Sequence, residues 1–74
     1  MDETVTVGED GIRLGQLLKL VGAVDTGGET KALLADGEVR VDGEVETRRG
    51  ARLAPGQVVS VHGATYRLAR ADLG

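Results

Sequence analysis

Arg48, Arg49 and Arg52 lie close together in the second half of the chain. No acidic residue occurs within residues 47–70, which therefore carry a charge of +5. Guanidinium groups donate paired hydrogen bonds that match the geometry of phosphate oxygens. The cluster therefore indicates contact with a localised anionic partner, and the alternative is a solvated loop whose charge only keeps the chain soluble.

Further polar side chains are candidates for the same surface. Three of them follow the exposed side of a predicted first helix, one lies on a predicted second helix and one on a predicted hairpin: Arg13, Gln16, Lys19, Lys31 and Arg40. The alternatives are an ordinary polar helix surface and, for Arg40, an ion pair with Glu44. Arg67 and Arg70 are expected to be solvated charges on an edge strand, where they deter pairing between sheets.

Thr26, Gly27 and Gly28 stand at the expected start of the second helix. The unpaired backbone N–H groups of a helix start can hold a phosphate group, and glycine permits close approach of a nucleic-acid backbone. The alternative is a flexible turn in which Glu29 already occupies the positive end of the helix dipole.

Several kinds of chemistry lack the residues that they need. The chain has no cysteine and one histidine, which excludes a disulfide framework and a thiolate metal site. Ser60 and His62 are two positions apart, but no acid is arranged beside them for nucleophilic catalysis. We therefore expect a protein that is not an enzyme and needs no metal or cofactor.

The 74 residues are expected to form one domain with a core of aliphatic side chains, because Tyr66 is the only aromatic residue. The net charge of −3 is divided unevenly: residues 1–10 carry −4 and residues 11–74 carry +1. The acidic segment could dock on the sheet or screen the basic surface. The chain has no apolar run of the ~20 residues that a membrane span requires, and its start lacks the apolar region of a signal peptide, so a cytoplasmic monomer is expected.

Hydrophobic periodicity predicts the main elements. It indicates a strand at 4–7, a helix at 12–21 that Asp10 could cap, a second helix at about 27–36, and strands at 57–61 and 65–69. Thr26 is the expected N-cap of the second helix and Gly37 its C-terminal stop. This order favours an α+β fold with two short helices on a mostly antiparallel sheet.

Residues 38–47 are expected to form a β-hairpin around Asp42-Gly43. A two-residue loop would place Val41 opposite Glu44. A three-residue loop would pair Val39 with Val45 and Arg40 with Glu44. Because the longer loop separates apolar from charged faces, the sequence favours that register.

The order of these segments resembles the αL RNA-binding motif, a domain named after a small-subunit ribosomal protein, and more narrowly its stand-alone bacterial YbcJ-like members. The resemblance covers roughly residues 12–63 and is carried by Ile12-Arg13-Leu14, Leu17-Leu18-Lys19, residues 27–34, residues 37–43 and Glu46-Thr47-Arg48-Arg49. Family members usually begin the second helix with Ser-Arg, where this chain has Thr26-Gly27. They usually carry an acid in the first helix, where this chain has Gly15.

The resemblance implies a protein without enzymatic activity that binds structured RNA, ribosomal or transfer RNA, in ribosome assembly or translation. Recognition is expected through phosphate and shape, since RNA duplexes offer side chains little sequence information. A protein-interaction module that kept the fold is the main rival, motivated by the acidic segment. A ubiquitin-like carrier and a small hydrolase are weaker rivals, because the two adjacent helices argue against the first and the second lacks a site.

Overall fold

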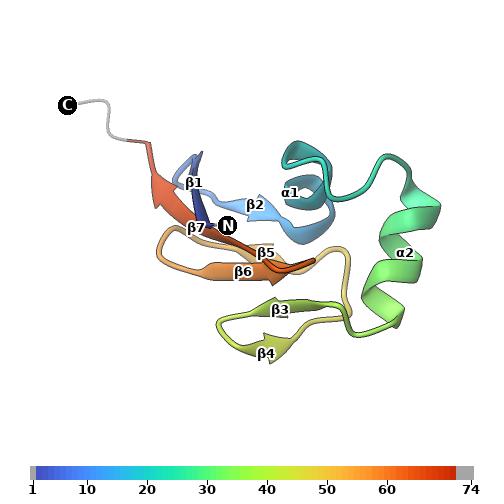
Figure 1. Ribbon diagram of the computed structural model, residues 1–74. Coiled ribbons are helices and arrows are strands. Elements are labelled where there is room, and N and C mark those ends of the chain that lie inside the picture. Colours follow the sequence, from blue (N-terminus) through green and yellow to red (C-terminus); the bar gives the residue numbers. More distant parts are fainter. Residues whose placement is uncertain (1, 72–74) are drawn as a thin grey trace.

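The computed structural model describes residues 2–71, whose helices and strands are shown in Figure 1. Short strands alternate with two helices that are adjacent in the chain. In chain order the elements are β1 (Asp2–Val7), β2 (Ile12–Arg13), α1 (Leu14–Leu20), α2 (Gly27–Ala35), β3 (Val39–Val41), β4 (Glu44–Val45), β5 (Arg52–Leu53), β6 (Val58–Val61) and β7 (Ala64–Arg70).

The larger sheet has the strand order β1-β7-β6-β3-β4. Its three pairings among β7, β6, β3 and β4 are antiparallel, whereas β1 lies parallel to β7. Strands β2 and β5 form a separate antiparallel pair. The predicted α+β fold with a mostly antiparallel sheet is therefore confirmed, and β6 and β7 agree closely with the strands expected at 57–61 and 65–69.

Helix α1 is shorter than the sequence pattern predicted. Ile12 and Arg13 are strand residues that pair with Leu53 and Arg52 of β5, so the helix begins at Leu14. The sequence had suggested Asp10 as the cap of this helix. The N-cap is instead Arg13, whose backbone N–H donates to Oε1 of Gln16 at 3.2 Å. The expected bounds of 12–21 were wrong because Ile12 and Arg13 pair with the distant β5, which the local sequence does not reveal, and Val21 is the C-cap.

Helix α2 has the boundaries that its terminal residues predict. The hydroxyl oxygen of Thr26 accepts a hydrogen bond from the Glu29 backbone N–H at 3.1 Å, which confirms Thr26 as the N-cap. The helix ends at Ala35, and Gly37 adopts a φ of 72°, a left-handed conformation that glycine enters without steric cost.

The favoured hairpin register was wrong. Arg40 pairs with Val45 and Val41 pairs with Glu44, so the loop has two residues. Both loop residues, Asp42 and Gly43, have positive φ angles of 52° and 87°, which is the type I′ geometry that matches the twist of the flanking strands. The face argument failed because β4 is an exposed edge strand, where neither face has to be apolar.

Buried leucine and valine side chains of both helices and both sheets form one core, as the lack of aromatic residues predicted. Its fully buried members include Leu14, Leu17, Leu18, Leu34, Val39, Leu53, Val59 and Leu68. Tyr66 packs against the margin of this core. No helix within residues 2–71 is both long enough and apolar enough to cross a membrane.

The acidic N-terminal segment docks on the sheet. Strand β1 pairs with β7 along its whole length, from Asp2 opposite Thr65 to Val7 opposite Arg70. Because β1 covers it, β7 is an interior strand, so Arg67 and Arg70 are exposed charges but do not protect an edge as expected. The edges of this sheet are β1 and β4 (Figure 1).

Candidate nucleic-acid interface

A groove of about 300 Å³ lies between the two helices and is bordered by the segment that links β4 to β5. We call it the interhelical groove. Its lining comes from β2, both helices and that linking segment, and consists of Arg13, Gly15, Gln16, Lys19, Gly27, Thr30, Arg49 and Gly50. The groove thus brings together residues that the sequence had proposed separately, from positions 13 to 49.

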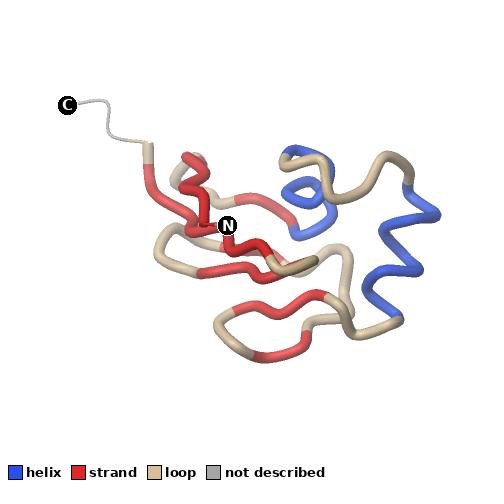
Figure 2. Tube along the Cα trace, in the orientation of Figure 1, coloured by secondary structure: helices blue, strands red, loops and turns tan. Residues whose placement is uncertain are grey.

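The linking segment passes the start of α1 (Figure 2), which holds it by two backbone hydrogen bonds. The backbone N–H of Leu14 donates to the carbonyl of Ala51, and that of Gly15 donates to the carbonyl of Arg49, each at 2.9 Å. The first N–H groups of a helix have no partner within the helix and need such acceptors. These two hydrogen bonds therefore fix residues 49–51 beside the groove.

Arg49 enters the groove by crossing α1 at Gly15. A Cβ atom at Gly15 would lie 2.6 Å from Cγ of Arg49, so the arginine stem occupies the space that any other residue would fill. Sequence reasoning did not place Gly15 in the site. The available signal was a glycine inside a helix, where it is unfavourable unless close packing requires it.

The groove is basic, and no acidic side chain among the described residues that line it offsets this charge. Its basic lining residues are Arg13, Lys19 and Arg49. The one ion pair recorded within residues 2–71 joins Arg48 to Glu46, so none of these three cations has a carboxylate partner there. Unpaired cations on one concave surface are suited to a phosphate-bearing ligand.

The three arginine side chains at 48, 49 and 52 lie in different surroundings. Nη2 of Arg48 lies 3.2 Å from Oε1 of Glu46, and its side chain is 78% exposed. Nη1 of Arg52 donates to the carbonyl of Asp10 at 3.0 Å. Only Arg49 of the three lines the groove. Arg52 also lies directly opposite Arg13 in the β2–β5 pair, where two like charges are unfavourable without an anion nearby.

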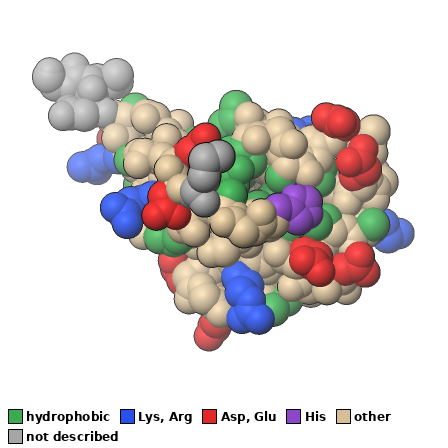
Figure 3. Space-filling model, viewed as in Figure 1, with side chains coloured by type: hydrophobic (Ala, Val, Ile, Leu, Met, Phe, Trp, Pro, Cys, Tyr) green, Lys and Arg blue, Asp and Glu red, His purple; other side chains and the backbone are tan. Residues whose placement is uncertain are grey.

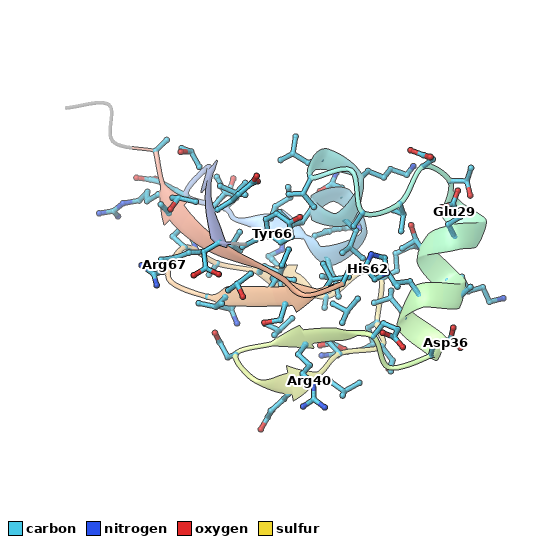
Figure 4. The ribbon with its side chains drawn as sticks, viewed as in Figure 1. Glu29, Asp36, Arg40, His62, Tyr66 and Arg67 are labelled. Atoms are coloured by element: carbon cyan, nitrogen blue, oxygen red, sulfur yellow. The ribbon has the colours of Figure 1, made fainter. Side chains whose placement is uncertain are left out.

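Four other predicted residues lie outside the groove. Lys31 shares with Arg49 a second hollow, of about 550 Å³, along α2. Arg40 projects from the β3–β4 hairpin (Figure 4) and donates to the carbonyl of Gly43 at 3.2 Å. Thr26 serves as the α2 cap, and a Cβ atom at Gly28 would meet only Oγ1 of Thr26, at 3.9 Å.

The face seen in Figure 3 is not uniformly basic. Acidic side chains gather on it beside α2, and Figure 4 places Glu29 and Asp36 at this end of the molecule. Residues 2–71 contain no group of His, Cys, Asp or Glu side chains arranged to hold a metal ion. The interhelical groove, in contrast, has three basic side chains and no acidic one among its described lining residues, which suits it to phosphate.

Glu46 stabilises the start of the linking segment. Its carboxylate accepts hydrogen bonds from the side chain of Arg48 and from the backbone N–H groups of Arg48 and Thr47. The hydrogen bond from the Arg48 side chain is the main cause that holds the pKa of Glu46 below its ordinary value, and the Arg48 backbone N–H adds to it. A lowered pKa means that this stabilisation is complete at neutral pH and is lost as pH falls through the lowered value.

We expect an NMR carboxyl titration to find the pKa of Glu46 below the ordinary glutamate value, because three donors favour its charged form. Arg48→Ala removes the strongest donor and should raise the pKa of Glu46 towards the ordinary value. An Arg67→Ala control, with the same loss of charge at a distant site, should leave it unchanged. Equal values for Glu46 in the wild type and in Arg48→Ala would contradict this account.

The fold and the groove define a small α+β domain in which the two helices, β2 and the segment that links β4 to β5 line a basic groove. A family model described as the S4 domain matches residues 5–69, and the chain belongs to this family. The match extends beyond the residues 12–63 that carried the resemblance in the sequence.

Its relatives confirm the YbcJ-like resemblance. YbcJ of Escherichia coli, named provisionally as an RNA-binding protein, is 44% identical over 57 residues, which cover 77% of this chain and 81% of YbcJ. RlbA of Bacillus subtilis, named provisionally as a ribosome maturation protein, is 38% identical over 63 residues, or 85% of this chain and 89% of RlbA. The solution structure of YbcJ has a TM-score of 0.67 at 37% identity, covering 89% of this chain and 85% of YbcJ; it is described as revealing an αL motif involved in RNA binding.

Proposed function

We propose that this protein binds structured RNA, ribosomal or transfer RNA, through the interhelical groove, and that it acts in ribosome assembly or translation without catalysing a reaction. One observation carries the proposal: Arg13, Lys19 and Arg49 line a concave surface with no acidic side chain among its described residues. The names given to YbcJ and RlbA support RNA and the ribosome as the setting.

Phosphate and shape contacts fit this surface better than base reading. The groove offers two guanidinium groups and one ammonium group, but no aromatic side chain on which a base could stack, among the residues that line it. Three cations neutralise few phosphates, so the logarithm of the affinity should fall with the logarithm of the salt concentration with a slope of about −2 to −3. We further propose a cytoplasmic monomer that needs no metal or cofactor.

The proposal is tested by fluorescence anisotropy with labelled ribosomal RNA fragments, transfer RNA and matched duplex DNA at low and high salt. We expect a preference for RNA and salt-sensitive affinity. Lys19→Ala/Arg49→Ala should reduce the affinity by at least about tenfold, because each lost cation removes a charge-assisted contact. Arg67→Ala/Arg70→Ala, with the same loss of charge on β7, is the matched control and should bind within about twofold of the wild type.

Equal losses in the two double variants would show that only net charge matters and would contradict the groove as the binding site. Absence of binding to every RNA at low salt would refute the proposed function. The main rival, a protein-interaction module, would then take its place. It is favoured by the exposure of Leu20 on α1, a residue that is 63% exposed, and it predicts association that survives high salt.

A further inference from the structure

The interhelical groove depends on a residue that carries no functional group. Gly15 is buried in the first turn of α1, and its backbone N–H donates to the carbonyl of Arg49 at 2.9 Å. A Cβ atom at this position would lie 2.6 Å from Cγ, 3.3 Å from Cδ and 3.4 Å from the carbonyl oxygen of Arg49. The backbone and the side-chain stem of Arg49 thus both lie against the same glycine.

A second glycine marks where the arginine ends. A Cβ atom at Gly27, the first residue of α2, would lie 3.9 Å from Nη1 of Arg49. The side chain therefore runs from Gly15 on α1 to Gly27 on α2 and carries its charge across the groove. Arg49 as a whole is nevertheless exposed, so its guanidinium group is accessible to a ligand.

We propose that Gly15 is a positioning residue for RNA binding: the space above it directs the Arg49 guanidinium to the α2 side of the groove, where it holds one phosphate group of the RNA. The inference rests on the proposed function, which it deepens by naming the ligand group and the residue that sets its place. Any larger residue at position 15 forces the stem away, since a carbon pair at 2.6 Å is far inside van der Waals contact.

Gly15→Ala tests the position of Arg49 without changing the charge of the protein. It keeps every basic residue and displaces only the Arg49 side chain. Alanine is also the better helix former, so the substitution does not weaken α1 by helix propensity. The test is a double-mutant cycle of wild type, Gly15→Ala, Arg49→Ala and the double variant, with RNA affinity measured by anisotropy. Gly28→Ala is the matched control, since its Cβ atom would meet only Thr26 Oγ1 at an ordinary 3.9 Å.

We expect Gly15→Ala to lose affinity by the same factor as Arg49→Ala, within about twofold, and to have no further effect in the Arg49→Ala background. Its salt slope should become as shallow as that of Arg49→Ala, although no charge has been removed. Gly28→Ala should behave like the wild type. Additive losses in the cycle, or wild-type affinity in Gly15→Ala, would overturn the inference.

A second measurement does not depend on RNA. A nuclear Overhauser contact between the Gly15 Hα protons and the Arg49 Hγ protons is expected in the free protein and should disappear in Gly15→Ala, while urea unfolding confirms that the variant is folded. If this contact is absent from the wild type, the inference that the Arg49 side chain packs against Gly15 is refuted. If the contact is present and no RNA binds, the proposed function fails, and the phosphate role of Arg49 fails with it.

Discussion

Replacing Arg49 with alanine is expected to weaken the binding of structured RNA by about tenfold. A charge-assisted hydrogen bond contributes about 1.5–3 kcal/mol, and the exposed position of Arg49 favours the lower end, which corresponds to about tenfold in the dissociation constant. The salt slope should become shallower by about 0.7–0.9, the contribution of one phosphate contact. Anisotropy titrations over a series of salt concentrations measure both quantities.

Arg48→Ala is the sharpest control, because it removes the same charge from the adjacent position. Arg48 already pairs with Glu46 and does not line the interhelical groove. We expect the RNA affinity of Arg48→Ala to remain within about twofold of the wild type, because an exposed ion pair such as Arg48–Glu46 contributes little free energy. Alanine at position 49 keeps the carbonyl that accepts from Gly15, so the segment stays anchored. Similar losses in the two variants would mean that the segment binds through charge density alone.

Leu18→Ala is expected to destabilise the fold by about 2–5 kcal/mol, the range for a buried leucine replaced by alanine. The Leu18 side chain is 0% exposed at the centre of the core. A domain of this length has a total stability of roughly 4–11 kcal/mol, so the change removes a large part of it. Urea denaturation followed by circular dichroism measures the loss as a lower transition midpoint.

Leu20→Ala makes the same chemical change two positions along the same helix. Because Leu20 is 63% exposed, we expect Leu20→Ala to lower the free energy of unfolding by less than about 0.5 kcal/mol. The comparison removes helix propensity as an explanation, since both variants replace leucine with alanine in α1. A loss in Leu20→Ala as large as that in Leu18→Ala would contradict the assignment of the core face.

Features of the fold that depend on neighbours in sequence could be predicted. The α2 boundaries follow from Thr26 and Gly37, whose capping roles need only adjacent residues. Features that depend on pairing between distant segments could not be predicted from the sequence. Ile12 directly precedes α1 in the chain, and its position opposite Leu53 is what makes it a strand residue. The hairpin register likewise depended on whether β4 has a neighbour on its outer side, which local alternation does not reveal.

The candidate site divides in the same way. The basic character of Arg13, Lys19 and Arg49 could be predicted from composition, and the structure places all three on one groove. That Arg48 turns to Glu46 while Arg49 turns to Gly15 depends on the backbone path of the linking segment. Charge counting treats the two neighbours alike, so the sequence could not distinguish them.

The parallel pairing of β1 with β7 has a consequence for how the chain acquires its fold. Asp2 and its partner Thr65 are 63 positions apart, the difference of their numbers. Contacts between such distant segments form slowly, because loop closure must precede them, whereas the β3–β4 and β6–β7 hairpins join neighbouring residues. During synthesis β1 leaves the ribosome before β7 and cannot pair with it until β7 has emerged. The sheet is therefore completed only after β7 has left the exit tunnel, and until then β1 lacks the strand with which it pairs in the folded protein.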